Sequence, residues 1–541
     1  MTTLDARPAL SAARRAAEPG QARRLAGSPA RRAAEPGQAR RLAVSPARRA
    51  AEPDQARHLW RIFSSSAFIL GAICTAFAVI ALRVKANTNP FQDEGLYLYM
   101  GHRMIDHIIS GVHVSEYPGS YFSGAPGLYP VVGAIADSIA GLQGARLVSL
   151  FFACIVIVGT YGIGSELFGK VSGLLGAATF ALCGSVIFIS HLATFDAMAL
   201  CLTTFGCWLT AYSANHDKLF WAPIVGLILT CALLTKYAMA VYVPGIAAIG
   251  MLLAWPHIRW GALRRACLIV TATAAAVFFI LTFWAADLKR GIVSTTVHRI
   301  PLSPTPREEL IWYAVEWIGP WILLAVLGAL TQKHRWPISL VLLTMSVIGP
   351  LQQIRIGEGT SLSKHVAFGI VFAAPLIGSL LAWMVKRTKW VGVPIVVAVA
   401  AVMMASGTRN AEQFLTTWVD DREMVAQLRE EIAISPHKAI LGEEPSAQRY
   451  TLRSVTAPEQ WNDTFVLLYG NKQGEAAYRE AIDQTHFGTI YLTLNTVNGR
   501  KINEYLTNSQ TPYRLSKKVP FYRHGQYAGN YLVWTPKVLG R

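Results

Sequence analysis

The chain has 541 residues, of which 52% are hydrophobic and only 15% charged, and its mean hydropathy is +0.34. Soluble proteins carry about 25% charged residues, so this composition excludes a simple soluble enzyme, a disordered chain and a fibrous protein, and predicts a polytopic membrane protein. The net charge of +18 is distributed over an N-terminal tail and the short gaps between apolar stretches, which favours membrane orientation over nucleic-acid binding.

The N-terminal tail has a composition of its own. Residues 13–60 contain three copies of a unit that begins ARRAAEP, with a period of 17 residues. Each unit is basic and has little to bury except Ala, so we predict a disordered basic tail over residues 1–62. The tail either contacts anionic lipid headgroups or simply holds the N-terminus in the cytoplasm, and a translation start further downstream is a third interpretation. No cleavable signal peptide is expected, because the first apolar stretch begins only near Ala67.

The apolar stretches predict the membrane spans. Crossing the hydrocarbon takes about 20 mostly apolar residues. Eleven stretches meet this requirement, and we predict a transmembrane module over residues 63–406. The predicted spans are residues 65–84, 145–166, 171–190, 197–214, 219–235, 237–255, 264–286, 311–331, 336–353, 366–385 and 389–406.

One further apolar stretch, residues 128–142, is short and contains Asp137. With eleven spans, nearly every basic loop lies on the same side as the N-terminal tail, whereas a twelfth span here would reverse every later loop. We therefore expect this stretch to lie along the interface or to re-enter it. The protein is predicted to be a multi-pass plasma-membrane protein with a cytoplasmic N-terminus. The outer segments are then residues 85–144, 191–196, 287–310, 354–365 and those after about residue 407.

The composition changes again after Arg409. Residues 411–434 repeat with helical period, residues 474–482 form a second helical stretch, and short β-type runs occur after the first. We predict an extracytoplasmic α/β domain over residues 407–541, whose role is either acceptor recognition or a structural cap. The predicted strands are residues 439–442, 464–470, 489–494 and 530–535.

Acidic residues on the outer side are the first candidates for chemistry. The first outer loop holds adjacent carboxylates, Asp93 and Glu94, in NPFQDEGLYLYMG. One of them is a candidate general base, and both suit a substrate hydroxyl or a divalent cation, with a solvated acidic loop as the alternative. In HLATFDAMA, Asp196 opens a span, where an ionisable group is either functional or the N-cap of the helix. His191 in the same loop either joins this site or is an ordinary interface residue.

Basic residues at the outer boundary form the second set of candidates. Lys236 lies in LLTKYAM, and Arg146 lies in GARLVSL at the head of the second span. Lys364 and His365 are adjacent in SLSKHVAFG. Such cations can neutralise a phosphate, whereas snorkelling without a function is the alternative. Moving a group from a lipid-linked phosphate to an acceptor hydroxyl requires carboxylates, cations and apolar helices on one membrane face.

The order of these motifs resembles the polytopic glycosyltransferases of the GT-C class, nearest to the protein O-mannosyltransferase and lipid A aminoarabinose transferase branch. The acidic motif of that family corresponds to DEGLY at residues 93–97, which adds Tyr97 to the substrate-binding candidates. GARLVSL followed by ELFG, then HLATFDAMA, LLTKYA and SLSKHVAFGIVFAAPLIG follow in the family's order. The resemblance covers roughly residues 65–405, and a soluble extracytoplasmic domain after the last span also fits it.

The resemblance implies a GT-C fold and an inverting transfer from a polyprenyl-phosphate sugar to an acceptor hydroxyl on a cell-envelope glycan, lipid or protein. Asp93 would deprotonate the acceptor, and Asp196 and Glu94 would orient acceptor or sugar, or ligate a metal. Lys236 and Lys364 would stabilise the leaving phosphate. A divalent cation, with Asp93 and Glu94 as its ligands, is the one cofactor considered, and nucleic acid is not expected as a partner.

One segment departs from the family pattern. Family members often have Lys-Pro-Pro before the second span, with the Lys near the donor phosphate, whereas residues 123–130 read SGAPGLYP and lack that Lys. Donor phosphate binding must then use other cations, or the donor differs. Two other classes are weighed against the glycosyltransferase. They are a transporter or lipid flippase without covalent chemistry, and a membrane scaffold without catalysis.

Overall fold

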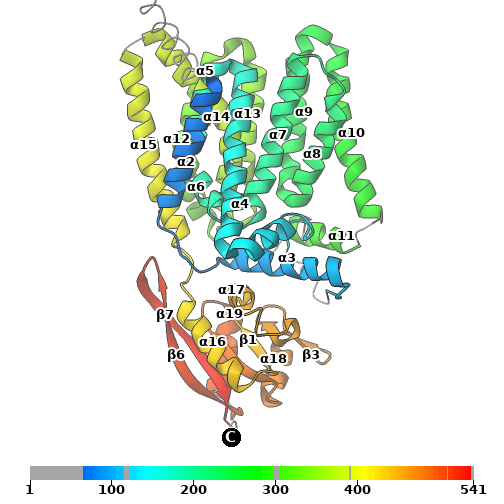
Figure 1. The fold of residues 1–541 in the computed structure, drawn as a ribbon, viewed down its shortest axis with the longest axis vertical. Helices are drawn as coiled ribbons and strands as arrows, with labels where there is room; N and C mark the ends of the chain where they lie inside the picture. Colours follow the sequence, from blue (N-terminus) through cyan, green and yellow to red (C-terminus); the bar gives the residue numbers. More distant parts are fainter. Residues whose placement is uncertain are drawn as a thin grey trace, which may run out of the picture. The chain divides into compact units, whose positions relative to one another are not determined.

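The computed structural model describes residues 65–114, 122–283, 286–297, 305–388, 391–508 and 510–537. The predicted basic tail, residues 1–62, lies outside these described residues. In the rest of the chain long helices run side by side, and a five-stranded sheet forms from residues near the C-terminus (Figure 1). The predicted fold class, a helical polytopic membrane protein followed by an α/β region, is confirmed.

The helices agree with the predicted spans. Within the described ranges, nine helices are long and apolar enough to cross a membrane, the bent pair α5–α6 would make a tenth, and α8 is apolar but shorter. Each of the eleven predicted spans overlaps one of these helices. They are α2 (Ser66–Arg83), α4 (Tyr129–Phe168), α5 (Lys170–Ala181), α6 (Gly184–Ser190), α7 (Phe195–Asn215), α8 (Trp221–Thr235), α9 (Val243–Ile258) with η3 (Tyr237–Tyr242) before it, α10 (Trp260–Phe283), α12 (Arg307–Thr331), α13 (Trp336–Ile356) with η5 (Lys333–Arg335) before it, α14 (Leu362–Thr388) and α15 (Gly392–Leu415).

The predicted outer segments contain helices of their own. α3 (Gln92–Ser110) lies across one end of the long helices in Figure 1, and α11 (Ala286–Ile292) is followed by η4 (Val293–Val297). Residues 128–142 are not a separate element, because they form the first part of α4. Non-helical backbone at Ala140 and Gly141 separates this part from the second predicted span. The positive φ of 65° at Gly141 lies in the left-handed region that favours glycine.

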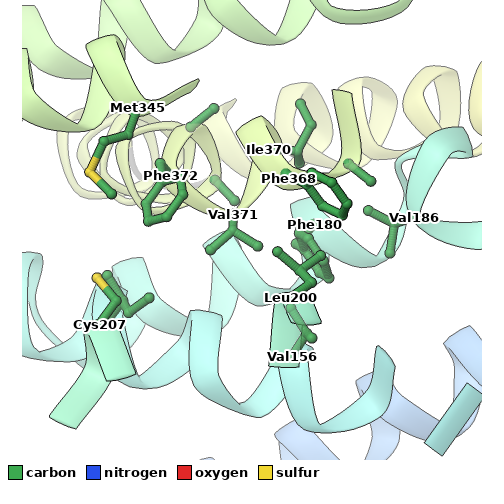
Figure 2. Packing of buried hydrophobic residues seen from close by; sticks show 14 of the residues in the cluster. Val156, Phe180, Val186, Leu200, Cys207, Met345, Phe368, Ile370, Val371 and Phe372 are labelled. Atoms are coloured by element: carbon green, nitrogen blue, oxygen red, sulfur yellow. The ribbon is translucent and has the colours of Figure 1, made fainter. Parts of the chain in front are cut away.

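The buried centre of the helical part is built around α14. Every residue from Leu362 to Leu381 of this helix is buried, as expected for a helix that is apolar on all sides. Figure 2 shows Phe368, Val371 and Phe372 of α14 close to side chains from other helices, among them Phe180, Val186, Leu200 and Met345. This packing brings the first turn of α14, which carries Lys364, into the interior of the helical part.

The α/β region follows α15. Its main sheet has the strand order β2-β1-β5-β7-β6, in which β1 is parallel to β2 and β5 whereas β7 is antiparallel to β5 and β6. Strands β3 and β4 form a separate pair. The elements are α16 (Arg422–Ile434), β1 (Ala439–Gly442), α17 (Ser446–Thr451), η7 (Pro458–Gln460), β2 (Trp461–Asp463), β3 (Leu468–Tyr469), β4 (Lys472–Gln473), α18 (Gly474–Asp483), β5 (Phe487–Leu492), α19 (Val497–Asn508), β6 (Tyr513–Arg523) and β7 (Gln526–Pro536).

Two local predictions in this region were wrong. The helical period over residues 411–434 spans two helices, since α15 ends at Leu415 and α16 begins at Arg422. The apolar run 464–470 is not one strand, because Asp463 accepts a hydrogen bond from the amide of Phe465 and turns the chain there. β6 was missed, because its lysines and arginines mask the β pattern.

A buried carboxyl joins the α/β region to the loop after α2. Asp421 accepts hydrogen bonds from Nδ2 of Asn89 at 2.9 Å and from Nε2 of Gln448 at 2.8 Å. Burial raises the pKa of Asp421 to about 7, although the hydrogen bond from Asn89 acts in the opposite direction. The charged form of Asp421 is therefore disfavoured in the folded protein relative to the unfolded chain.

The raised pKa of Asp421 predicts a pH dependence of stability. The pKa of Asp421 in the unfolded chain is about 3.9. The contribution of Asp421 to the stability of the folded protein is therefore fully present below about pH 4 and is lost as the pH rises through about 7. We expect the melting temperature of the purified protein to fall across this window, and the fall to be smaller in Asp421→Asn. Equal pH slopes for the wild type and the variant would contradict the prediction.

Candidate active site

Asp93 and Lys364, which are 271 positions apart in the sequence, form an ion pair. Asp93 lies in the first turn of α3 and Lys364 in the first turn of α14. Nζ of Lys364 is 2.5 Å from Oδ2 of Asp93 and 3.5 Å from Oδ2 of Asp196. The Asp93 side chain is 34% exposed, whereas the side chains of Lys364 and Asp196 are buried. Lys364 therefore bridges one accessible and one buried carboxylate.

Asp196 continues this line of charges. Its Oδ1 is 2.6 Å from Nζ of Lys236, and its Oδ2 accepts a hydrogen bond from Oγ1 of Thr194 at 2.8 Å. The Lys236 ammonium also lies 4.9 Å from the ring centroid of Phe195. The side chains thus form a chain of alternating charge, which runs Asp93, Lys364, Asp196, Lys236. The structure brings together these four predicted site residues from α3, α7, α14 and the residue that follows α8.

Lys236 occupies a break between two helices. Its backbone is extended, with φ −148° and ψ 117°, between α8 and η3. The segment SGAPGLYP, which differs from the family pattern, forms backbone hydrogen bonds with the residues on either side of Lys236. The amide of Ala125 donates to Leu234 O at 2.7 Å, and the amide of Tyr237 donates to Ser123 O at 2.9 Å. The segment that lacks the family's lysine therefore holds the backbone on both sides of Lys236.

Glu94 and Arg146 face each other inside the helical part. Nε and Nη2 of Arg146 donate to the two carboxylate oxygens of Glu94 at 2.8 and 2.7 Å. The amides of Phe91 and Ala193 also donate to Glu94. Arg146 donates further to backbone oxygens of Asn87 and Asn89. Both side chains are almost fully buried, so the pair ties α3, α4 and the loop before α7 together and offers no free oxygen for a substrate.

The remaining predicted residues surround these ion pairs. The Tyr97 ring stacks on Phe195 with a centroid distance of 4.3 Å. His365 is buried, with Nδ1 2.8 Å from Ser361 O and Nε2 3.0 Å from the side-chain amide of Gln353. Tyr97 thus packs on Phe195, the residue before Asp196, whereas His365 is turned toward the residue before its own helix and toward α13.

His191 is neutral at neutral pH. It follows the last residue of α6. Burial and the nearby Arg146 guanidinium lower the pKa of His191 to about 4, although Glu94 acts in the opposite direction. His191 therefore adds no positive charge for a phosphate.

The carboxylates do not fit a divalent cation in this arrangement. No group of three or more His, Cys, Asp or Glu side chains that could hold a metal occurs in the described part of the chain. Both oxygens of Glu94 accept hydrogen bonds, and Asp93 and Asp196 each face an ammonium group. A cation at Asp93 and Glu94 would have to displace Arg146 and Lys364.

The sequence did not predict a second buried cluster, in which several polar side chains surround one carboxylate. Asp137 in α4 lies 2.6 Å from Nε2 of His102, accepts from the Tyr450 hydroxyl at 2.5 Å and pairs with Arg453 at 2.9 Å. The one available signal was an acidic residue inside an apolar stretch. Its partners lie 35 to 316 positions away, so no local pattern could reveal them.

Comparisons with known proteins agree with the predicted resemblance. Residues 130–284 match the family described as dolichyl-phosphate-mannose-protein mannosyltransferase. No curated protein matches the chain.

Solved structures share the fold. ArnT from Cupriavidus metallidurans in the apo state has a TM-score of 0.57 at 14% identity, over 87% of this chain and 98% of that one. The same protein bound to undecaprenyl phosphate has a TM-score of 0.55 at 14% identity, over 88% and 99%. The archaeal oligosaccharyltransferase AglB from Archaeoglobus fulgidus, in complex with an inhibitory peptide and a dolichol-phosphate, has a TM-score of 0.53 at 11% identity, over 85% and 74%. The chain therefore has the fold of these GT-C glycosyltransferases, and its residues 130–284 carry the sequence pattern of the mannosyltransferase family.

Proposed function

We propose that this protein transfers a sugar from a polyprenyl-phosphate donor to an acceptor hydroxyl at the outer face of the plasma membrane. The observation that carries the proposal is the alternating chain Asp93, Lys364, Asp196, Lys236. It combines a partly exposed carboxylate with two ammonium groups beside apolar helices. The fold is shared with one protein bound to undecaprenyl phosphate and another bound to a dolichol-phosphate.

Each side chain has a defined part in this reaction. The donor phosphate oxygens bind the ammonium groups of Lys364 and Lys236, and Asp93 is released from Lys364 to accept the proton of the acceptor hydroxyl. The acceptor oxygen then bonds to the anomeric carbon while the bond from that carbon to the phosphate oxygen breaks. Polyprenyl phosphate leaves with the electron pair, and attack from the opposite side inverts the anomeric centre.

Asp196 acts on the two lysines. It lies between them, 2.6 Å from Lys236 and 3.5 Å from Lys364, and its side chain is not exposed. The negative charge that develops on the leaving phosphate is stabilised by ammonium groups that are already in position. Glu94 and Arg146 keep the first turn of α3 in place, and Tyr97 packs on Phe195, the residue before Asp196.

The direct test is an assay of the purified full chain with a panel of polyprenyl-phosphate sugars and hydroxyl acceptors from the cell envelope. We expect release of free polyprenyl phosphate together with a glycosylated acceptor of inverted anomeric configuration. Movement of the intact donor across sealed vesicles, without covalent transfer by any panel member, would replace the proposal with a flippase.

Sidedness has a separate test. We propose a cytoplasmic N-terminus and an extracytoplasmic α/β region. A cysteine introduced at the exposed Ser516, in a variant whose seven native cysteines are replaced, should react with a membrane-impermeant thiol reagent added to intact cells. Reaction only after the cells are opened would place the site on the wrong side for this donor.

The pairing of residues 123–125 with the Lys236 break predicts the effect of one substitution. A Cβ added to Gly124 would meet the backbone oxygen of Thr235, whereas a Cβ added to Gly127 in the same loop meets nothing within 4 Å. We expect Gly124→Ala to lower kcat by about 10-fold or more, because the ammonium moves away from the phosphate. Gly127→Ala is the matched control, and equal rates for the two variants would contradict the prediction.

A further inference from the structure

We propose that the loop from β1 to α17 in the α/β region fixes the position of Asp93. The α/β region then contributes directly to the geometry of the active site. The inference rests on the proposed function, because it concerns the carboxylate that accepts the acceptor proton. It assigns the region a role beyond the two considered for it, acceptor recognition and a structural cap.

Gln92, the residue before Asp93, is the first contact. Its Nε2 donates to the backbone oxygen of Glu444, and its Oε1 accepts from the amide of Ala447 at 3.2 Å. A single amide group therefore holds both sides of the turn between β1 and α17. Because both partners are backbone groups, the α/β region presents a fixed surface to the first turn of α3.

Gly95 is the second contact. A Cβ at this position would lie 2.5 Å from Ser446 O and 2.7 Å from Cα of Ala447, both backbone atoms that cannot rotate away. One helical turn further along α3, the Arg449 guanidinium lies 4.2 Å from the ring centroid of Tyr99. The backbone of α17 thus rests directly on the backbone of α3.

The direction of three successive side chains explains why this contact matters for Asp93. Residues 92, 93 and 94 occupy one turn of α3, where consecutive side chains point about 100° apart. Gln92 is held by the α/β region, and Glu94 is held by Arg146 and the amide of Ala193. Asp93 lies between two anchored neighbours and points toward Lys364. Loss of either anchor leaves the rotation of this turn, and with it the position of the Asp93 carboxylate, underdetermined.

Other residues of α17 hold the same contact. Gln448 donates to Asp421, which in turn accepts from Asn89 in the loop before α3. The Tyr450 hydroxyl donates to Asp137 in α4. A helix of six residues therefore makes direct polar contacts with α3 and α4, and is linked through Asp421 to the loop between α2 and α3. This concentration of contacts at α17 indicates a positioning element.

The test compares Gln92→Met with Gln460→Met in the purified full chain. Methionine keeps the length of glutamine but makes no strong hydrogen bond. Gln460 is the matched control, since its side-chain amide also bonds only backbone groups, those of Pro436, Lys438 and Ala457 within the α/β region. We expect Gln92→Met to lower kcat about 10-fold or more with the donor KM changed less than about twofold. Gln460→Met should retain wild-type kcat.

A second pair of variants changes the backbone contact instead of the hydrogen bonds. Gly95→Ala should lower kcat in the same way, whereas Gly71→Ala in α2, where an added Cβ meets nothing within 4 Å, should not. Hydrogen exchange supplies a readout that needs no activity. Gln92→Met should speed amide exchange in the first turns of both α3 and α17, and Gln460→Met should leave the first turn of α3 unchanged.

The outcomes separate this inference from the proposed function. Transfer by the wild type that is lost in Asp93→Asn, together with equal kcat values in Gln92→Met and Gln460→Met, would overturn the positioning role alone. Unchanged exchange of α3 in Gln92→Met would overturn it even if no donor of the panel is used. Faster exchange in α3 and a selective fall in kcat would establish it.

Discussion

Asp93→Asn is expected to reduce sugar transfer by about 10²–10⁴-fold, the range that general base catalysis contributes. The amide cannot accept the acceptor proton, whereas Lys364 keeps Asp196 as its second partner at 3.5 Å, so the fold should persist. The measurement is the initial rate of polyprenyl-phosphate release by the purified variant, with its melting temperature recorded in parallel.

Asp106→Asn is the matched control for this variant. Asp106 lies on the same helix, is exposed and is remote from the lysines of the site. It should therefore transfer sugar at the wild-type rate. Wild-type turnover by Asp93→Asn in a correctly folded protein would remove Asp93 from the role of base and leave the proposed mechanism without a proton acceptor.

Arg146→Met is expected to have the largest effect on stability. It leaves Glu94 buried with a charge and without its guanidinium partner, which costs about 3–5 kcal/mol. The free energy of unfolding in detergent should fall by this amount, with the yield of folded protein falling too. The double variant Glu94→Gln with Arg146→Met should recover much of the loss, because the glutamine carries no charge into the interior.

Arg422→Met is the control for the loss of an ion pair as such. Arg422 also contacts both oxygens of an aspartate, Asp420, but its side chain is 68% exposed, and exposed pairs contribute little to stability. If Arg146→Met were no more destabilising than Arg422→Met, the pair with Glu94 would not be the structural anchor that its burial indicates.

The two sets of predictions also separate the roles of neighbouring carboxylates. Asp93 and Glu94 are adjacent in the sequence and were expected to share the chemistry. In the structure one is partly exposed and paired with Lys364, whereas the other is enclosed by Arg146 and two amides. Substitution at the first should affect rate, and substitution around the second should affect folding.

The helical part illustrates how far sequence patterns reach. Spans of about 20 apolar residues are local, so each of the eleven stretches could be recognised from composition alone. The kink at Gly141 and the bend of 69° between α5 and α6 could not, since helix direction depends on packing against neighbours. The turn after Asp463 could not be recognised either. There, one hydrogen bond from a backbone amide to the Asp463 side chain interrupts an apolar run that has the pattern of a strand.

The amino-acid sequence by itself determined the membrane class of this protein, its helical spans, and the residue types of the site, because hydrophobicity and charge are properties of each residue. Only the tertiary structure decided which carboxylate meets which cation. The partners of Asp93, Glu94 and Asp137 are 271, 52 and up to 316 positions away. Ion pairing depends on distances of a few ångströms that arise when helices pack, and that information is not contained in any single stretch of the chain.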